Sequence, residues 1–66
     1  MAVARVTKIT ASSKKGWEDA AKAGLKRSAE TIRGITGFTV VDQKAKVEDG
    51  RIAEYRITME VTFVLE

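Results

Sequence analysis

The sequence predicts an α+β domain of the order β-α-β-β, in which a three-stranded antiparallel sheet packs on one helix. Two patterns support this prediction. From Ala53 to Leu65 every odd position is apolar and every even position except Val64 is polar, and a period of two is typical of a strand with one buried face. Between residues 14 and 33, apolar residues recur at spacings of three and four, as they do in an amphipathic helix.

The first strand is expected from about Val3 to Thr10, where Val and Ile residues recur in an imperfect alternation. Ser12 and Ser13 follow it, and serine oxygens commonly accept hydrogen bonds from the first free N–H groups of a helix. We therefore expect the helix to begin at about Lys14.

The helix is expected to run to Arg33, because Gly34 directly after it is a good C-cap. Its predicted apolar stripe consists of Trp17, Ala21, Leu25, Ser28 or Ala29, and Ile32. The small residues in its middle are Ala20, Ala21, Ala23 and Gly24. Small side chains would allow the helix to pack closely against the sheet.

The chain after the helix is expected to form a hairpin of two strands, at about 38–47 and 51–65. The second of these is the most apolar strand and is therefore expected in the centre of the sheet, which gives the strand order 1-3-2. A two-residue turn at Asp49-Gly50 would pair Val47 with Ile52. A three-residue loop that also includes Glu48 would pair Val47 with Arg51 instead.

The three-residue loop is preferred because it satisfies both faces of the hairpin. In the two-residue register, Asp42 and Lys44 would lie opposite apolar residues of the last strand. In the three-residue register, Asp42 lies opposite Arg56 and Lys44 lies opposite Glu54, and each such pair contributes about 0.2–1 kcal/mol. The apolar side chains then gather on the other face.

The chain length and composition predict a single domain, residues 1–66, that assembles with copies of itself. A domain of about 60 residues is marginally stable alone, and this one has no Cys for a disulfide and no His for a zinc site. No signal peptide or membrane span is recognisable, so a cytoplasmic location without membrane contact is expected. The net charge of +3 is too modest to indicate nucleic-acid binding.

Several short motifs recur in an order and spacing that carry a family resemblance. They are Thr10 to Ser13 and Gly16 to Ala20 at the helix start, Thr31 to Arg33 at its end, and Val40 to Gln43, Val47 to Gly50 and Tyr55 to Glu66 in the hairpin. In this order, and with this total length, they resemble the dodecin family. The resemblance implies a βαββ fold, a hollow homododecamer and a non-enzymatic protein that binds or stores a flavin, either FMN or riboflavin.

The resemblance also implies where a flavin site would lie. Flavin-binding dodecins carry a Trp after the helix that stacks on the flavin ring, and a Gln in the last strand that hydrogen-bonds the ring. The aligned residues here are Gly37 and Arg56. Phe38 could replace the Trp only if the backbone rotates, because adjacent strand residues point to opposite faces.

Asp42 is a candidate metal ligand. It aligns with an acidic residue that in some dodecins lies near a metal bound with the flavin, and its oxygens suit Mg²⁺ or Ca²⁺. Asp42 is alternatively a cross-strand partner of Arg56. Arg56 could itself bind a phosphate or another anion, or could form salt bridges with Asp42 and Glu60, and the sequence leaves these alternatives open.

Other residues favour structural roles. Trp17 lies on the apolar stripe of the helix and is expected to anchor the core rather than stack on a ligand. The basic helix residues are interpreted as a solvated outer face, with protein or nucleic-acid binding as a remote alternative. No nucleophile and base can be paired for catalysis. The second functional hypothesis is therefore a structural dodecin-like shell that has lost flavin binding and holds a metal ion or another small ligand.

Overall fold

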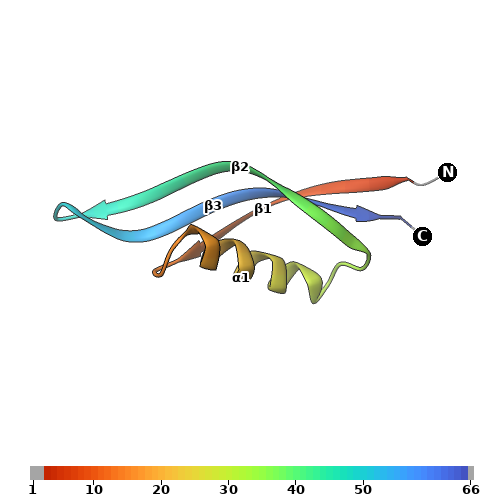
Figure 1. The fold of residues 1–66 in the computed structure, drawn as a ribbon, viewed down its shortest axis with the longest axis horizontal. Helices are drawn as coiled ribbons and strands as arrows, with labels where there is room; N and C mark the ends of the chain where they lie inside the picture. Colours follow the sequence, from red (N-terminus) through yellow and green to blue (C-terminus); the bar gives the residue numbers. More distant parts are fainter. Residues whose placement is uncertain (1–2, 66) are drawn as a thin grey trace.

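The computed structural model describes residues 3–65 and contains four elements in the predicted order. They are β1 (Ala4–Ser13), α1 (Trp17–Ala29), β2 (Ile35–Glu48) and β3 (Arg51–Val64) (Figure 1). The described part of the chain is elongated, with extents of 52 × 19 × 13 Å. Met1, Ala2 and Glu66, the last of which belongs to the hairpin motif noted above, lie outside the described residues.

The strands form one antiparallel sheet in the order β1-β3-β2, which confirms the predicted topology. β3 pairs with β1 in an unbroken register from Ala4–Val64 to Ser13–Tyr55. Because β3 has a neighbour on both sides, its alternate apolar residues are the most deeply buried of the sheet. Ile57 is 2% exposed, and Met59 and Val61 are fully buried.

Helix α1 lies across one face of the sheet, against β1 and β3 (Figure 1). Its buried residues are Ala20, Gly24 and Ser28, which recur every four residues along one side. The predicted stripe that begins at Trp17 and Ala21 is only partly buried, so the helix is rotated from the predicted orientation. The small residues face the sheet, and the larger apolar residues flank the contact.

The helix is shorter at its start than predicted. It begins at Trp17 after Gly16, without a side-chain cap, because Ser13 is still part of β1. The Ser13 hydroxyl accepts a hydrogen bond from the Lys15 N–H (2.9 Å) and donates one to Asp19 Oδ2 (2.6 Å). Ser13 therefore holds the turn between strand and helix and does not cap the helix.

The helix is also shorter at its end, where Glu30 and not Gly34 is the C-cap. Gly34 lies further on and has a φ of +73°, a conformation that favours glycine. Its carbonyl oxygen accepts a hydrogen bond from the Val64 N–H (3.0 Å). Gly34 thus joins the end of β3 to the segment that leads into β2.

The predicted three-residue hairpin loop is wrong. The turn has two residues, Asp49 and Gly50, with φ values of 52° and 74°, and it pairs Glu48 with Arg51. Two positive φ values define the type I′ turn, whose twist matches that of the flanking strands. The backbone preference of Asp-Gly decides the turn, and the strands adjust to it.

The β2–β3 register contains three irregularities, between Lys46 and Val47, between Val40 and Asp42, and between Ile35 and Gly37. Each inserts an extra residue into one strand, as a β-bulge does. Between the first two, Lys44 lies opposite Arg56, two places from the predicted partner. A shift of two residues preserves the predicted faces from Asp42 to Lys46. Before Asp42 the irregularity reverses the faces, so that Val40 and Phe38 lie opposite Met59 and Val61 on the helix side.

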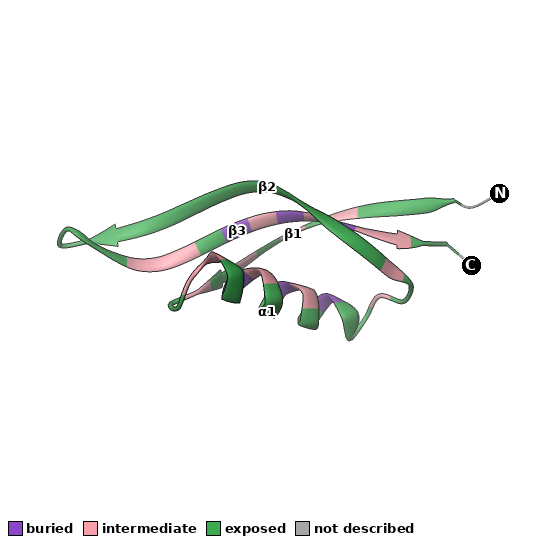
Figure 2. Ribbon diagram, viewed as in Figure 1, coloured by how far each residue is buried: buried purple, intermediate pink, exposed green. Residues whose placement is uncertain are grey.

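The buried core is small and lies at the middle of the sheet, where α1 covers it (Figure 2). It consists of Ala20, Ile57, Met59 and Val61, with partly buried Ile9, Ala11, Trp17 and Ala21 packed around Ala20, Ile57 and Met59. Nine large apolar residues are exposed among residues 3–65: Val3, Val6, Phe38, Val40, Val41, Val47, Ile52, Val64 and Leu65. More apolar side chains are exposed than buried, which favours association with another chain. None of the helices in the described range is long and apolar enough to cross a membrane.

Gly24→Ala tests the close contact between helix and sheet. A Cβ at this position would lie 3.0 Å from Ala11 Cβ and 3.0 Å from the buried Met59 Cε. Alanine is the better helix former by about 1 kcal/mol, yet overpacking costs about 1–3 kcal/mol. We expect the melting temperature, measured at a fixed protein concentration, to fall. Ala23→Gly at the exposed neighbouring position is the control for helix propensity. A higher melting temperature for Gly24→Ala than for the wild type would contradict the close packing of helix and sheet.

Candidate ligand-binding face

Three of the four positions suggested by sequence as ligand or metal contacts, Gly37, Asp42 and Arg56, lie on one surface of the sheet, and Phe38 lies on the other. Ile57, Met59 and Val61 point toward α1, so the even-numbered residues of β3 point to the opposite side. We call this side the polar face. Its rows across β1, β3 and β2 are Ser12–Arg56–Lys44, Thr10–Thr58–Asp42, Lys8–Glu60–Thr39 and Val6–Thr62–Gly37.

Gly37 leaves an open position on the polar face. A Cβ built there would meet no atom within 4 Å, so a larger side chain has room in the protomer. Phe38 pairs with Val61 and therefore points to the helix side of the sheet, where it is 41% exposed. A ligand resting on Gly37 would not reach the Phe38 ring of the same protomer.

Arg56 lies on the same face as Gly37 but in a distant row of the sheet. Gly37 is opposite Thr62, which is six residues from Arg56 on β3. At about 3.4 Å per residue, the two positions are about 20 Å apart. A ligand the size of one flavin ring cannot contact both in a single protomer.

The Arg56 side chain contacts a neighbour on its own strand, β3. Its Nε donates a hydrogen bond to Glu54 Oε1 at 2.7 Å, and the Arg56 side chain is half-exposed. The predicted salt bridges of Arg56 to Asp42 and Glu60 are not among the ion pairs of residues 3–65. The register places Lys44, not Asp42, opposite Arg56, which is why the predicted pair does not form.

The carboxyl group of Glu54 is stabilised in its charged form. The hydrogen bond from Arg56 is the main cause that lowers the pKa of Glu54 below its usual 4.5, and partial desolvation opposes it. The positive charges of Arg56, Lys46 and Lys14 lower the pKa further. The predicted partner of Glu54 was Lys44, and the contact of Glu54 with Arg56 on the same strand was not predicted.

Asp42 is half-exposed, and its Oδ2 lies 3.7 Å from Lys44 Nζ. Residues 3–65 contain no group of three metal-binding side chains, so the carboxylates around Asp42 in one protomer do not form such a group. Calcium binds six to eight oxygens. The row of Asp42 also holds the hydroxyls of Thr58 and Thr10, which are 3.1 Å apart.

Trp17 anchors the core, as predicted. Its ring packs edge-on against Tyr55, with centroids 4.9 Å apart at 80°, and its Nε1 donates a hydrogen bond to the Lys44 carbonyl oxygen at 3.0 Å. The indole therefore links the start of α1 to both β3 and β2. Its N–H is already used and its ring is packed, which leaves little for a ligand.

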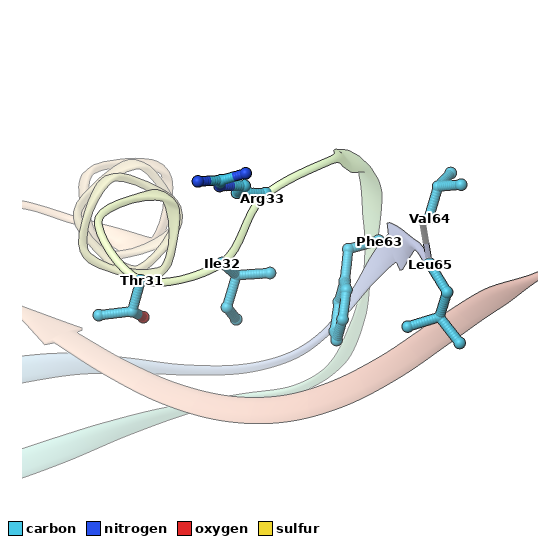
Figure 3. Close-up of a pocket in the computed structure, with 6 residues that line it drawn as sticks. All are labelled: Thr31, Ile32, Arg33, Phe63, Val64 and Leu65. Atoms are coloured by element: carbon cyan, nitrogen blue, oxygen red, sulfur yellow. The ribbon is translucent and has the colours of Figure 1, made fainter.

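Two hollows lie outside the polar face. One of about 280 Å³ lies beyond the end of α1 and is lined by Thr31, Ile32, Arg33, Phe63, Val64 and Leu65 (Figure 3). The other, of about 300 Å³, lies between α1 and β1 and includes Ile9, Gly24 and Arg27. Each has mostly apolar walls and a single charged residue, so neither offers the convergent polar groups of a ligand site.

The fold and the polar face define a small βαββ protein of the ligand-binding type, and the comparisons identify the family. The family model named Dodecin matches residues 3–66, so the chain belongs to the dodecin family. It is 30% identical over 64 residues to the dodecin of Thermus thermophilus, an alignment that covers 97% of this chain and 93% of the relative. The structure is similar to that of the dodecin from Streptomyces davaonensis, with a TM-score of 0.93 and 34% identity over 98% of this chain and 96% of the other.

A calcium-binding relative is also similar to this chain. The calcium dodecin of Mycobacterium tuberculosis is 32% identical over 63 residues, which cover 96% of this chain and 89% of the relative. Its solved structure, described as having a novel calcium-binding site, matches with a TM-score of 0.83 over 97% of this chain and 91% of that one. At least one similar dodecin is therefore described as binding calcium.

Arg56→Gln tests the electrostatic coupling on the polar face. Loss of the hydrogen bond should raise the pKa of Glu54 toward 4.5, as measured by NMR titration of its carboxyl carbon. Because the folded-state pKa is lowered in the wild type, this contact stabilises the fold above about pH 4.5, and its contribution is lost as the pH falls through the folded pKa. Arg27→Gln, which removes the exposed pair with Glu30, is the control. An unchanged Glu54 pKa in Arg56→Gln would show that the contact is absent in solution.

Proposed function

We propose that this protein is a non-enzymatic, small-ligand-binding homo-oligomer whose ligand lies on the polar face where protomers meet. The observation that carries the proposal is the placement of Gly37 and Arg56, which share this face but are about 20 Å apart. Two positions that serve one ligand in the family would come together here only between two protomers. The site is then complete only in the assembly.

Self-association is supported by the surface of the protomer. Exposed apolar residues lie on both sides of the sheet and at its ends, including Val6, Phe38 and Ile52. The chain has no disulfide to compensate for its small core. Burial of these residues in subunit contacts would supply the missing hydrophobic stabilisation. The number of twelve subunits rests on family membership.

FMN or riboflavin is the first ligand to test, because it is the ligand that the family resemblance implies. The residues on the polar face fit a flavin ring poorly, since none of the side chains in its four rows is aromatic. Stacking contributes substantially to the binding of a flat ring. We therefore expect flavin to bind more weakly than it would to a variant with an aromatic residue at Gly37.

The second candidate function is a shell that holds a metal ion or another small ligand instead of flavin. It is favoured by the half-exposed carboxylate of Asp42 beside two threonine hydroxyls on the polar face. A single carboxylate requires further oxygens from water or from another protomer. Mg²⁺ and Ca²⁺ both suit such ligands.

Native mass spectrometry with FMN and riboflavin tests the first proposal. The wild type should be an oligomer, of twelve subunits if it assembles as the resemblance implies, that gains flavin masses only at high flavin concentration. Gly37→Trp should bind flavin at least about tenfold more tightly, because the open position accepts an indole that can stack.

Thr39→Trp is the matched control, since it adds the same side chain to the same face at a different row. Equal flavin affinity for the wild type and both variants would place the ligand elsewhere. A protein that is monomeric at micromolar concentration would refute a ligand site formed between protomers.

Calcium-dependent melting tests the second candidate. If Asp42 contributes to an ion site, the melting temperature should rise with millimolar CaCl₂ and fall again with chelator, and Asp42→Asn should remove the rise. Asp49→Asn removes the same charge at the hairpin turn, where Asn tolerates the positive φ, and should leave the calcium response intact. A melting temperature that is the same with calcium and with chelator would exclude the ion site.

A further inference from the structure

Two cations face each other across the polar face. Lys44 on β2 lies directly opposite Arg56 on β3, with no residue between them. Like charges at directly opposed positions are destabilising. Each cation has one carboxylate beside it on its own strand, Asp42 for Lys44 and Glu54 for Arg56, and no carboxylate lies directly between the two cations.

This opposition is a consequence of the two-residue turn and of the register irregularity between Lys46 and Val47. In the unshifted three-residue register, Asp42 would lie opposite Arg56 and neutralise it. The observed register moves Asp42 to a position opposite Thr58 and brings Lys44 to Arg56. The backbone thus separates a carboxylate from Arg56 and places an ammonium group there.

The surroundings are positively charged in sum. Lys46 lies opposite Glu54, and Lys14 is near enough to Glu54 to lower its pKa. The four cations of this region are Lys14, Lys44, Lys46 and Arg56, and its two carboxylates are Asp42 and Glu54. Its net charge of +2 accounts for most of the +3 of the whole chain.

The row also has donors to spare. Within residues 3–65, Arg56 makes one side-chain hydrogen bond, through Nε, and a guanidinium has five N–H donors. The contact of Lys44 with Asp42 is long, at 3.7 Å, and solvent-exposed. Ser12 lies opposite Arg56 on the other side and brings a hydroxyl to the same row. A guanidinium, an ammonium and a hydroxyl in one row suit a phosphate group, which accepts hydrogen bonds at several oxygens and carries close to two negative charges.

We infer that Arg56, Lys44 and Ser12 form a binding site for the phosphate group of a small anionic ligand. The inference deepens the proposed function, because it rests on the polar face as the ligand-binding surface. It assigns to Arg56 recognition of charge in place of recognition of a flat ring. Free phosphate and a phosphorylated small molecule share this chemistry, and the experiment separates them.

The test compares FMN with riboflavin, which differ by one phosphate group. At low salt the wild type should bind FMN about tenfold more tightly than riboflavin, and rising salt should narrow this ratio. Arg56→Gln and Lys44→Gln should each bring the ratio close to one, even if Arg56→Gln raises the affinity for both flavins. Lys26→Gln, on the exposed side of α1, should leave the ratio unchanged. A wild-type ratio near one, or a ratio that falls equally in all three variants, would overturn the inference.

If neither flavin binds, the result counts against flavin as the ligand but does not test the phosphate site. A second measurement then tests the phosphate site directly. Isothermal titration with inorganic pyrophosphate and with ADP should then show binding that Arg56→Gln and Lys44→Gln remove and Lys26→Gln retains. Tighter binding of ADP would identify a phosphorylated small molecule, and equal or tighter binding of pyrophosphate would identify the free anion. Absence of binding by either probe would overturn the phosphate site.

Discussion

The length of the helix relative to the strands constrains the whole molecule. The 13 residues of α1 span about 20 Å, whereas the 14 residues of β2 or β3 span about 48 Å. One helix can therefore cover only the middle of the sheet, where Ile57, Met59 and Val61 are buried. Both ends of the sheet, and β2 apart from the contact of Trp17 with Lys44, remain uncovered on the helix side. Burial of this surface between subunits would complete the hydrophobic core.

Two contacts fix the position of this short helix. At its middle, Gly24 permits a spacing that the Cβ atom of any other residue would disturb, since Ala11 and Met59 lie directly beneath it. At its start, Trp17 reaches past β3 to the Lys44 carbonyl oxygen and packs against Tyr55. The first contact sets the distance of helix from sheet, and the second ties β2 to the helix. Two of the three irregularities in the β2–β3 register lie on either side of Lys44, so Trp17 contacts the segment between them.

The strand order and the buried face of β3 could be predicted because the apolar character and the alternation of β3 are visible in the sequence. The cross-strand partners in the hairpin could not be predicted, because each extra residue shifts the pairing by one place and the sequence does not show where the extra residues lie. The Asp49-Gly50 turn was recognisable, but charge pairing favoured the wrong loop length. Cross-strand charge pairs contribute under about 1 kcal/mol each, and they do not outweigh the preference of Asp-Gly for a two-residue turn with two positive φ values. The helix ends were also misplaced, since Ser13 and Gly34 serve neighbouring turns instead of capping the helix.

The same reasoning separates what was predictable about the candidate site from what was not. Alternation along the strands predicted that Asp42 and Arg56 share one face, but Gly37 joins them only through the irregularity between Val40 and Asp42, which reverses the sides of the β2 residues before it. Their distances and partners depend on the bulges, which no composition or charge count reveals. One shifted segment places Lys44 instead of Asp42 opposite Arg56, while each cation keeps a carboxylate on its own strand. The net charge of the polar face is the same in either register, but the observed register brings two cations into one row of the sheet.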